Sequence, residues 1–442
     1  MTLQDSPGLP APAPAPSPPR PGTEPPQRLT LATAVVALGG LLFGFDTGVI
    51  SGALLFLKED FGLTSFQEGT VISALLLGAA AGALGSGRPA DRFGRRRVLI
   101  AVALTFTVGL VAAVAAHDFA TMVAARLVLG LAVGGASTVV PLYLAEIAPP
   151  RLRGRLVTAN QVLLTVGILV SYLVNLAYSG SGNWRAMFAV GLIPSVLMLV
   201  GTFCIPESPE WLRRRSGRGR AGGPAARNAG SLPLGDTAVR RALVIGVTLA
   251  AVQQFGGINS IIYYAPSIMS RAGLPATNSI QYSVFIGVVN VAMTVVAIPL
   301  IDRAGRRPLL LFSLAGMALS LATLGVTMSF PSGPSTNMIA LLAMVTYVGS
   351  FAVGLGPVFW ILAAELFPPG ARARGAALCA LVNWAANFVV GQLFLPVADA
   401  VGVSWVFWFF AAVASGALVF VVRKVPETKN RSLADIQLEL RA

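Results

Sequence analysis

The chain has 442 residues, of which 55% are hydrophobic and only 11% are charged, and its mean hydropathy is +0.75. This composition excludes a soluble globular protein and indicates a polytopic helical membrane protein. The net charge of +14 does not indicate a nucleic-acid partner, because the basic residues fall between apolar segments. The only cysteines, Cys204 and Cys379, exclude a disulfide framework and lack metal-ligand spacing.

Twelve apolar segments approach or exceed the length of about 20 residues that a helix needs to cross a bilayer. An even number of spans places both termini on the same side. That side carries 28 of the 32 Lys and Arg residues, so we expect a multi-pass protein of the cell membrane with both termini in the cytoplasm. The segments are expected at residues 29–55, 66–87, 98–116, 120–145, 156–178, 184–205, 240–266, 279–301, 308–329, 337–363, 374–397 and 402–422.

An internal repeat divides these segments into two halves. The sequence DRFGRR at residues 91–96 returns as DRAGRR at 302–307, and PES at 206–208 returns as PET at 426–428. The predicted fold is therefore an all-α membrane protein with twelve transmembrane helices in two pseudo-symmetric six-helix halves. Parallel halves of this kind place a substrate at their interface, near the middle of the bilayer.

The repeat also sets the predicted domain boundaries. The N-terminal half covers residues 29–212 and the C-terminal half covers 240–424, with a shortened cytoplasmic linker at 213–239 between them. Residues 1–28 are rich in Pro and Ala and lack the apolar region of a signal peptide, which predicts a disordered cytoplasmic tail. Residues 425–442 form the C-terminal cytoplasmic tail.

The seventh apolar segment holds a concentrated group of uncharged polar residues, QQFGGINSIIYY at 253–264. Three carboxamides and two phenols at this depth cost several kcal/mol unless they face protein or a water-filled cavity. Amides and phenols suit a neutral polyhydroxylated ligand, and the pair Gly256-Gly257 is a place for the helix to break. The competing interpretation is that these residues hold neighbouring helices together through hydrogen bonds.

Taken together with PESPEWL at 206–212 and GPVFW at 356–360, these motifs resemble the sugar porter family of the major facilitator superfamily over about residues 30 to 430. The closest subtype is bacterial proton-coupled monosaccharide symporters. The resemblance implies import of a hexose or pentose, such as glucose or xylose, by alternating access, with no enzymatic step and no cofactor besides the coupling proton. A facilitative uniporter and a non-transporting sugar sensor are the alternatives. We expect a monomer in the lipid bilayer, with no nucleic-acid partner.

The resemblance also assigns a set of sugar-binding residues. Amide side chains pair with sugar hydroxyls and aromatic rings stack on the apolar C–H faces of a pyranose. For each aromatic residue taken singly, core packing competes with ligand contact. Because some bacterial members carry Gln where this chain has Asn383, the identity of the sugar stays open. The assigned residues are Phe43, Gln161, Gln253, Gln254, Asn259, Tyr263, Asn290, Trp360, Asn383 and Trp384.

Asp46 is the only carboxylate deep inside an apolar segment, and the repeat places a neutral Asn259 at the related position. A buried acid can be poised to load and release a proton, and Arg126 is the nearest candidate cation. We therefore predict that Asp46 and Arg126 couple transport to the proton, as in the symporters that the chain resembles. A static pair that holds two helices together is the competing interpretation.

Acidic and basic residues repeated at the cytoplasmic ends form a predicted gate. In the family such residues pair across the two halves and lock the outward-facing state. A purely topological role for the arginines competes with this interpretation. The predicted gate residues are Arg92, Glu146, Arg153, Glu207, Arg303, Glu365 and Arg374. The run GLGP at 354–357 is the predicted hinge of the tenth segment, with close helix packing as its alternative.

Overall fold

The computed structural model describes residues 26–149, 153–216, 236–271, 274–331, 333–368, 371–431 and 433–441. Within these ranges the chain is helical, and twelve spans are long and apolar enough to cross a membrane. The helices are α1 (Pro26–Phe61), α2 (Ser65–Phe93), α3 (Arg95–Ala115), α4 (Phe119–Ile147), α5 (Arg153–Ser179), α6 (Trp184–Val190), α7 (Leu192–Cys204), α8 (Pro209–Arg215), α10 (Thr237–Phe255), α11 (Ile258–Arg271), α12 (Ala276–Ala304), α13 (Arg306–Thr327), α14 (Pro334–Val353), α15 (Leu355–Glu365), α16 (Arg372–Val401), α17 (Val403–Lys424) and α18 (Leu433–Arg441).

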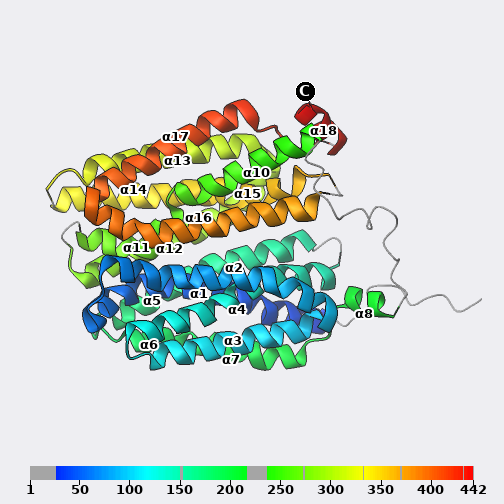
Figure 1. The fold of residues 1–442 in the computed structure, drawn as a ribbon, viewed down its shortest axis with the longest axis horizontal. Helices are drawn as coiled ribbons and strands as arrows, with labels where there is room; N and C mark the ends of the chain where they lie inside the picture. The colour runs from blue at the N-terminus through cyan, green and yellow to red at the C-terminus, as the bar shows by residue number, and fades with distance from the viewer. Residues whose placement is uncertain are drawn as a thin grey trace, which may run out of the picture.

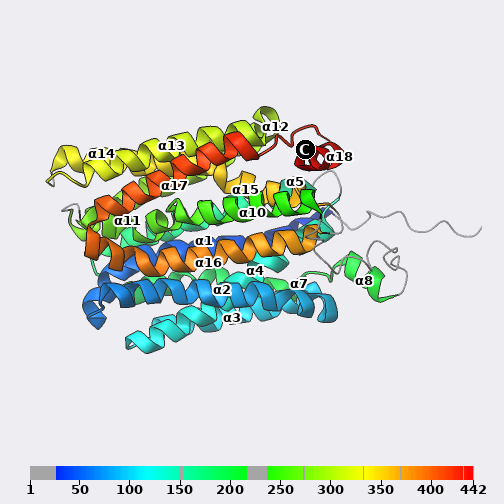
Figure 2. The same cartoon turned by 45° about the horizontal axis from the view of Figure 1, so that its top comes forward.

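The spans form two bundles that lie side by side with their axes roughly parallel. Helices α1 to α7 make one bundle and α10 to α17 make the other, as the division between the blue-to-green and green-to-red halves shows (Figure 1). Turning the molecule brings α1, α10 and α16 into the middle of the view, between the two outer layers (Figure 2). The predicted division into two six-helix halves is confirmed.

Three of the twelve spans are broken helices. The sixth breaks at Gly191 between α6 and α7, the seventh at Gly256-Gly257 between α10 and α11, and the tenth at Gly354 between α14 and α15. Gly257 has a φ of 89°, which L side chains rarely adopt, and a Cβ there would lie 2.4 Å from the Phe410 ring. The predicted break in the seventh span is confirmed, and the tenth span breaks at the start of the segment predicted as a hinge, whereas the break in the sixth span was not predicted.

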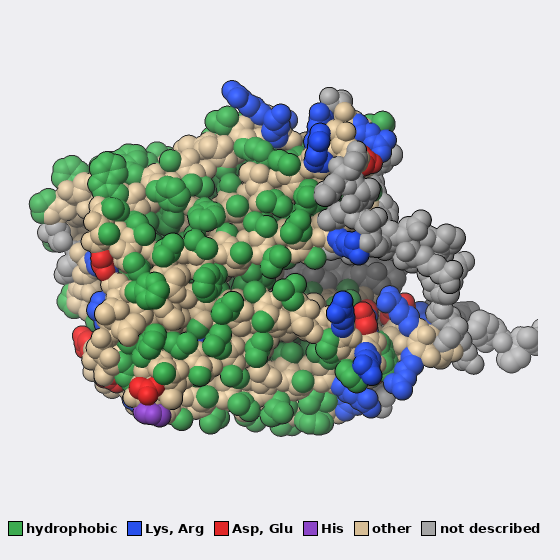
Figure 3. Space-filling model, in the orientation of Figure 1, with side chains coloured by type: hydrophobic (Ala, Val, Ile, Leu, Met, Phe, Trp, Pro, Cys, Tyr) green, Lys and Arg blue, Asp and Glu red, His purple; other side chains and the backbone are tan. Residues whose placement is uncertain are grey.

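One end of the bundle is basic. Lys and Arg side chains gather at the end that holds α8 and α18, and we call this the basic end (Figure 3). The loops at residues 93–95 and 304–306 also lie there, because α2 and α12 both end at that side. The other end, which holds the loops at residues 62–64 and 116–118, is called the opposite end.

The predicted linker and the two predicted tails are described by the structure only in part. Most of the predicted linker 213–239 and of the tail 1–28 lies outside the described residues. Within the C-terminal tail, α18 was not predicted; it packs against the start of α10 through Ile436 and Leu440, which are 3% and 4% exposed. Its apolar face spans little more than two turns, which is too short for a periodic signal to stand out in the sequence.

Candidate functional site

Four amide side chains from three helices form one hydrogen-bonded cluster in the C-terminal half. On α10 and α11, Asn259 Nδ2 donates to Gln254 Oε1 at 2.8 Å, and Gln254 Nε2 donates to Asn383 Oδ1 of α16 at 3.1 Å. Asn383 Nδ2 in turn donates to Gln253 Oε1 at 2.7 Å. We call Gln253, Gln254, Asn259 and Asn383 the amide cluster. The structure therefore brings together four of the six predicted amide residues.

Backbone carbonyls at the two helix breaks anchor this cluster. Gln253 Nε2 donates to the carbonyl oxygens of Leu355 and Gly356, at 3.2 and 3.3 Å, where α15 begins. The hydroxyl of Tyr347 on α14 donates to the carbonyl of Gly256 at 2.7 Å, in the break between α10 and α11. Breaks in two neighbouring spans thus meet at the cluster, where the Gly256 carbonyl accepts from Tyr347 and the first carbonyls of α15 accept from Gln253.

The aromatic wall of the site joins the two halves. The ring of Phe43 on α1 stacks on that of Trp384 on α16, with centroids 6.2 Å apart and planes inclined by 23°. Trp384 also lines a cavity of about 320 Å³ between α2, α4 and α16, on the basic-end side of the stacked pair. The remaining lining residues are Ala80, Ala83, Leu84, Thr138, Ala377, Ala380 and Leu381.

The other predicted contacts lie around this site and not in the amide cluster. Tyr263 is buried, and its hydroxyl lies 3.5 Å from Asn387 Nδ2. Asn290 on α12 is also buried, and among the described residues its side chain has no hydrogen-bond partner. Gln161 on α5 is exposed and stays outside the cluster. Trp360 is 48% exposed, and its ring meets Phe359 edge-on at 4.8 Å.

The predicted acid and base do form a pair. Asp46 and Arg126 are 2% and 1% exposed, and Arg126 Nη1 donates to Asp46 Oδ1 at 2.8 Å. The pair uses a single oxygen: Asp46 Oδ2 is buried without a hydrogen-bond partner, while Arg126 Nε reaches the carbonyl of Val71 at 3.3 Å. Asp46 lies three residues after Phe43, so both side chains share one face of α1. The ion pair is therefore about one helical turn from the aromatic wall.

The two halves are closed against each other near the opposite end. Gln392 on α16 accepts a hydrogen bond from Ser73 on α2 at 2.5 Å and donates to Thr70 at 3.2 Å. Further out, Asp399 accepts from Ser65 and from Arg271, the latter at 2.6 Å. We call this contact between α2 and α16 the outer seam. With the outer seam closed, the cavity beside Trp384 lies toward the basic end.

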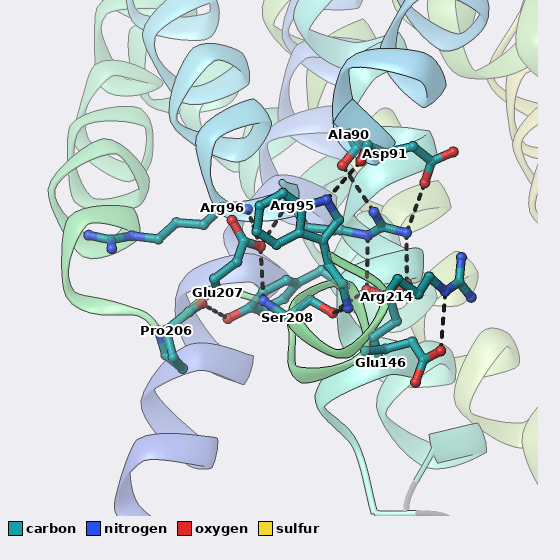
Figure 4. A network of polar contacts seen from close by, with 12 residues as sticks. Ala90, Asp91, Arg95, Arg96, Glu146, Pro206, Glu207, Ser208 and Arg214 are labelled. Carbon is teal, nitrogen blue, oxygen red and sulfur yellow. Dashed lines mark hydrogen bonds and ion pairs between the residues drawn. The ribbon is translucent and has the colours of Figure 1, made fainter. Parts of the chain in front are cut away.

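At the basic end each half holds its own acid–base network, and Figure 4 shows that of the N-terminal half. In the N-terminal half, Arg95 grips Glu146 with two nitrogens, each at 2.9 Å, and Ser208 also donates to Glu146. Glu207 Oε1 accepts from the backbone N–H groups of Arg95 and Arg96, at 2.9 and 3.1 Å. A carboxylate in this position neutralises the positive end of α3.

The C-terminal half repeats the arrangement. Arg306 Nη2 donates to Glu365 at 3.0 Å, and Thr428 donates to the same carboxylate at 2.6 Å. Glu427 accepts from the backbone N–H groups of Arg306 and Arg307, at 3.0 and 3.1 Å. Burial raises the pKa of Glu427, but hydrogen bonds from four backbone N–H groups outweigh it and hold that pKa below its ordinary value.

The predicted cross-half gate is not formed in this conformation. Glu146 and Glu365 pair within their own halves, and the exposed side chains of Arg92, Arg303 and Arg374 make no ion pair among the described residues. The local reason is the positive φ of Gly94 and Gly305, which reverses the chain so that the first arginine of α3 or α13 faces the acid. The side chain of Arg153 lies outside the described residues.

Three residues of the site were missed by the sequence reasoning. Tyr347 caps the break in the seventh span, Asn387 reaches Tyr263, and Gln392 builds the outer seam. Asn387 follows Asn383 by four residues, so helical periodicity along α16 was the available signal for it, whereas Gln392 lies nine residues after Asn383, on about the opposite face of the helix, and had no such signal. Within the described ranges, no cluster of His, Cys, Asp and Glu side chains is arranged to hold a metal ion.

Comparisons with known proteins agree with this geometry. A family model described as sugar (and other) transporter matches residues 32–231 and 227–440. The glucose transporter GlcP of Staphylococcus epidermidis is 38% identical, covering 92% of this chain and 96% of its own, and the galactose-proton symporter of Escherichia coli is 37% identical, covering 92% and 93%. The inward-open structure of the xylose transporter XylE from E. coli superposes with a TM-score of 0.80 at 31% identity, covering 93% and 99%.

The fold and the site thus define a multi-pass membrane transporter of the major facilitator type, and not an enzyme. The chain belongs to the sugar (and other) transporter family, so the resemblance stated from its motifs is confirmed.

Proposed function

We propose that this protein imports a monosaccharide together with a proton, by alternating access, with the basic end and both termini in the cytoplasm. The single observation that carries the coupling is the Asp46–Arg126 pair, which is buried in a span and satisfies only one carboxylate oxygen. The named functions of similar transporters for glucose, galactose and xylose support the substrate class.

The contrast between two ion pairs supports a titrating role for Asp46. Arg95 holds Glu146 through two parallel hydrogen bonds, a geometry that suits a permanent structural contact. Arg126 holds Asp46 through one, and the second oxygen is left buried and unpartnered, which costs about 1–3 kcal/mol. Protonation of Asp46 removes its negative charge and leaves Arg126 as a buried cation without a counter-ion, which destabilises the packing of α1 against α4 in this conformation.

The coupling route is short. Asp46 and Phe43 share one face of α1, and the Phe43 ring stacks on Trp384, the residue that follows Asn383 of the amide cluster. Release of Arg126 lets α1 shift against α4, which moves the aromatic wall against the amide cluster. A ligand that bridges Phe43 and Asn383 therefore has an affinity that depends on the protonation state of Asp46, as a linkage between the two sites requires.

Alternating access is supported by the unequal closure of the two ends. The outer seam joins the halves through direct hydrogen bonds, while the cavity beside Trp384 lies toward the basic end and the acid–base networks there stay within their own halves. We assign this conformation as inward-facing. The reverse state opens the outer seam and allows Glu146 and Glu365 to meet arginines of the other half.

The test of proton coupling is uptake of labelled glucose, galactose, xylose and arabinose into vesicles, with and without an imposed pH gradient. Wild-type protein should accumulate at least one of these sugars only with the gradient, and a protonophore should abolish the accumulation. Asp46→Asn should lose accumulation yet keep sugar exchange across the membrane. Glu59→Gln, which neutralises an exposed acid near the end of the same helix, should behave as wild type. Equal accumulation by Asp46→Asn would refute the coupling role.

The test of the sugar site is binding of the transported sugar to purified variants. Asn383→Ala removes a hydrogen-bond partner of Gln253 and Gln254 as well as a predicted sugar contact, so the dissociation constant should rise about 5- to 100-fold. Gln281→Ala, at an exposed position of α12, is the matched amide control and should leave it unchanged. If Asn383→Ala bound sugar like the control, the amide cluster would not be the sugar site.

A further inference from the structure

A second cavity lies at the basic end, away from the proposed sugar site. Its volume is about 560 Å³, and it is enclosed by the ends of α10 and α17, the first turn of α13, and α18. The lining divides into a basic group, an apolar group and one acid. The acid is Glu439, and the basic residues are Arg240, Arg241, Arg307, Arg423 and Lys424.

The charge of this cavity is not neutralised by the lining. Glu439, the one acidic residue among the described lining residues, is already paired with Arg431. Arg241 donates to the carbonyl of Leu440 and Arg307 to that of Val422, so neither meets an anion there. In addition, the Nε of Arg307 is buried and has no hydrogen-bond partner among the described residues. Among the described residues, the five cations that line this cavity therefore lack an anionic partner.

The internal repeat shows that the fold does not require this charge. In the N-terminal half, Arg96 takes the place of Arg307, and its Nε and Nη2 both find carbonyl partners, on Thr202 and Phe203. The repeat offset of 220 residues that relates 206–208 to 426–428 places Phe203 and Cys204 where the C-terminal half has Arg423 and Lys424. The same helix end is thus built without these cations in one half and with them in the other.

The cavity also has an apolar wall that continues toward the membrane. Val244 on α10 and Val422 on α17 are 54% and 50% exposed. Phe420, two residues before Val422 and so deeper in the span, also lines the cavity. A basic mouth above an apolar, outward-facing wall matches a molecule with an anionic head and hydrocarbon chains. Free phosphate would use the mouth and leave the wall exposed.

We propose that this cavity binds the phosphate headgroup of an anionic phospholipid, with its acyl chains along α10 and α17. The headgroup neutralises Arg423 and Lys424 and supplies an acceptor for Arg307. Because α18 closes one side of the cavity through Glu439 and Leu440, the bound lipid also fastens α18 to the C-terminal half.

The test is a titration of purified protein with phosphatidylglycerol, followed by native mass spectrometry at moderate salt. The first phosphatidylglycerol should bind more tightly than phosphatidylcholine. Arg423→Gln with Lys424→Gln should weaken it roughly 30-fold, since each basic side chain near an anionic headgroup contributes roughly fivefold. Arg213→Gln with Arg214→Gln removes the same charge from exposed positions of α8 and should leave the affinity unchanged.

Further arms separate the other outcomes. The exchange Arg423→Lys with Lys424→Arg keeps the charge and should keep the binding. If the double glutamine variant fails to fold, Lys424→Gln alone carries the test with a loss of roughly fivefold. Equal losses in the α8 and cavity variants would overturn the proposal in favour of general surface charge. Displacement of the lipid by inorganic phosphate would overturn it in favour of a soluble anion.

Discussion

A single hydroxyl on α5 closes a gap in the backbone bonding of α11. Pro266 has no N–H, so the carbonyl of Ile262, four residues earlier, loses its helical donor. The hydroxyl of Tyr172 donates to that carbonyl at 2.9 Å, across the boundary between the two halves. Tyr172→Phe removes only this donor. We expect the change to favour the conformation in which the halves part at the opposite end.

The size of the effect follows from burial. Tyr172 is fully buried, and a buried carbonyl left without a partner costs about 1–3 kcal/mol. When the outer side opens, water reaches both groups, so the cost falls on the closed conformation alone. The ratio of outer-open to outer-closed protein should therefore rise about 5- to 150-fold.

Labelling of a cysteine placed in the outer seam measures this ratio. Ile72 on α2 is 1% exposed and packs close to Gly391 on α16, so Ile72→Cys reacts with a membrane-impermeant maleimide only when the seam opens. The background carries Cys204→Ser and Cys379→Ala. Tyr172→Phe should raise the labelling rate by the factor given above.

Restoring the missing donor provides the decisive control. Pro266→Ala supplies an N–H to the Ile262 carbonyl from within α11, so Tyr172→Phe with Pro266→Ala should label at nearly the parental rate. The Tyr172 hydroxyl would not stabilise the closed conformation through the Ile262 carbonyl if Tyr172→Phe labelled no faster than the parent, or if the double variant labelled as fast as Tyr172→Phe alone.

Three further predictions concern stability, measured as the melting temperature of the purified protein. Gly257→Ala should lower the melting temperature strongly, because the backbone has a φ of 89° and the new Cβ would lie 2.4 Å from the Phe410 ring. The expected loss of unfolding free energy is about 2 kcal/mol or more. Glu146→Gln should destabilise more than Glu365→Gln, because its arginine partner is 2% exposed against 15%, and breaking a buried pair costs about 3–5 kcal/mol. The pKa of Glu427 in the folded protein lies below its ordinary value of 4.5, so its carboxylate stabilises the fold above pH 4.5. That contribution is lost as the pH falls through the lower pKa of the folded state. Glu427→Gln should therefore flatten the decline of the melting temperature in acid.

Each of these has an outcome that contradicts it. A Gly257→Ala protein that melts with wild type would show that the break in the seventh span tolerates a side chain. Equal losses for Glu146→Gln and Glu365→Gln would mean that burial does not set the strength of these pairs. A Glu427→Gln protein whose melting temperature falls with acid as steeply as that of wild type would place the titrating group elsewhere.

The spans and their repeat could be read from the chain because both are local properties. A run of about 20 apolar residues must cross the bilayer as a helix, and repeated motifs at matching offsets require matching halves. The break at Gly256-Gly257 was visible because a glycine pair stands beside polar residues in a span, whereas the run GLGP at 354–357 predicted a hinge with close helix packing as its alternative. Asp46 and Arg126 were identified for the same reason: a charge inside an apolar run needs a partner.

The partners at the basic end depended on direction in space. Arg92 and Arg95 are three residues apart, but Gly94 reverses the chain between them, so one arginine faces solvent and the other grips Glu146. Sequence spacing does not reveal which of the two arginines faces Glu146. The state of the gate was also undetermined, because one chain serves both conformations of a transporter and only coordinates show which side is closed.

What the sequence by itself determined is thus the membrane-spanning fold, the two halves and the chemical character of the polar residues inside them. Only the tertiary structure decided that Gln161 and Trp360 stay outside the amide cluster, that Tyr172 serves a carbonyl on the other half, and that basic residues from three helices line a cavity under α18. The physical reason is the distance along the chain over which each effect acts. Hydrophobic length and glycine geometry act within a few residues, whereas these contacts join segments tens to hundreds of residues apart and exist only once the helices have packed.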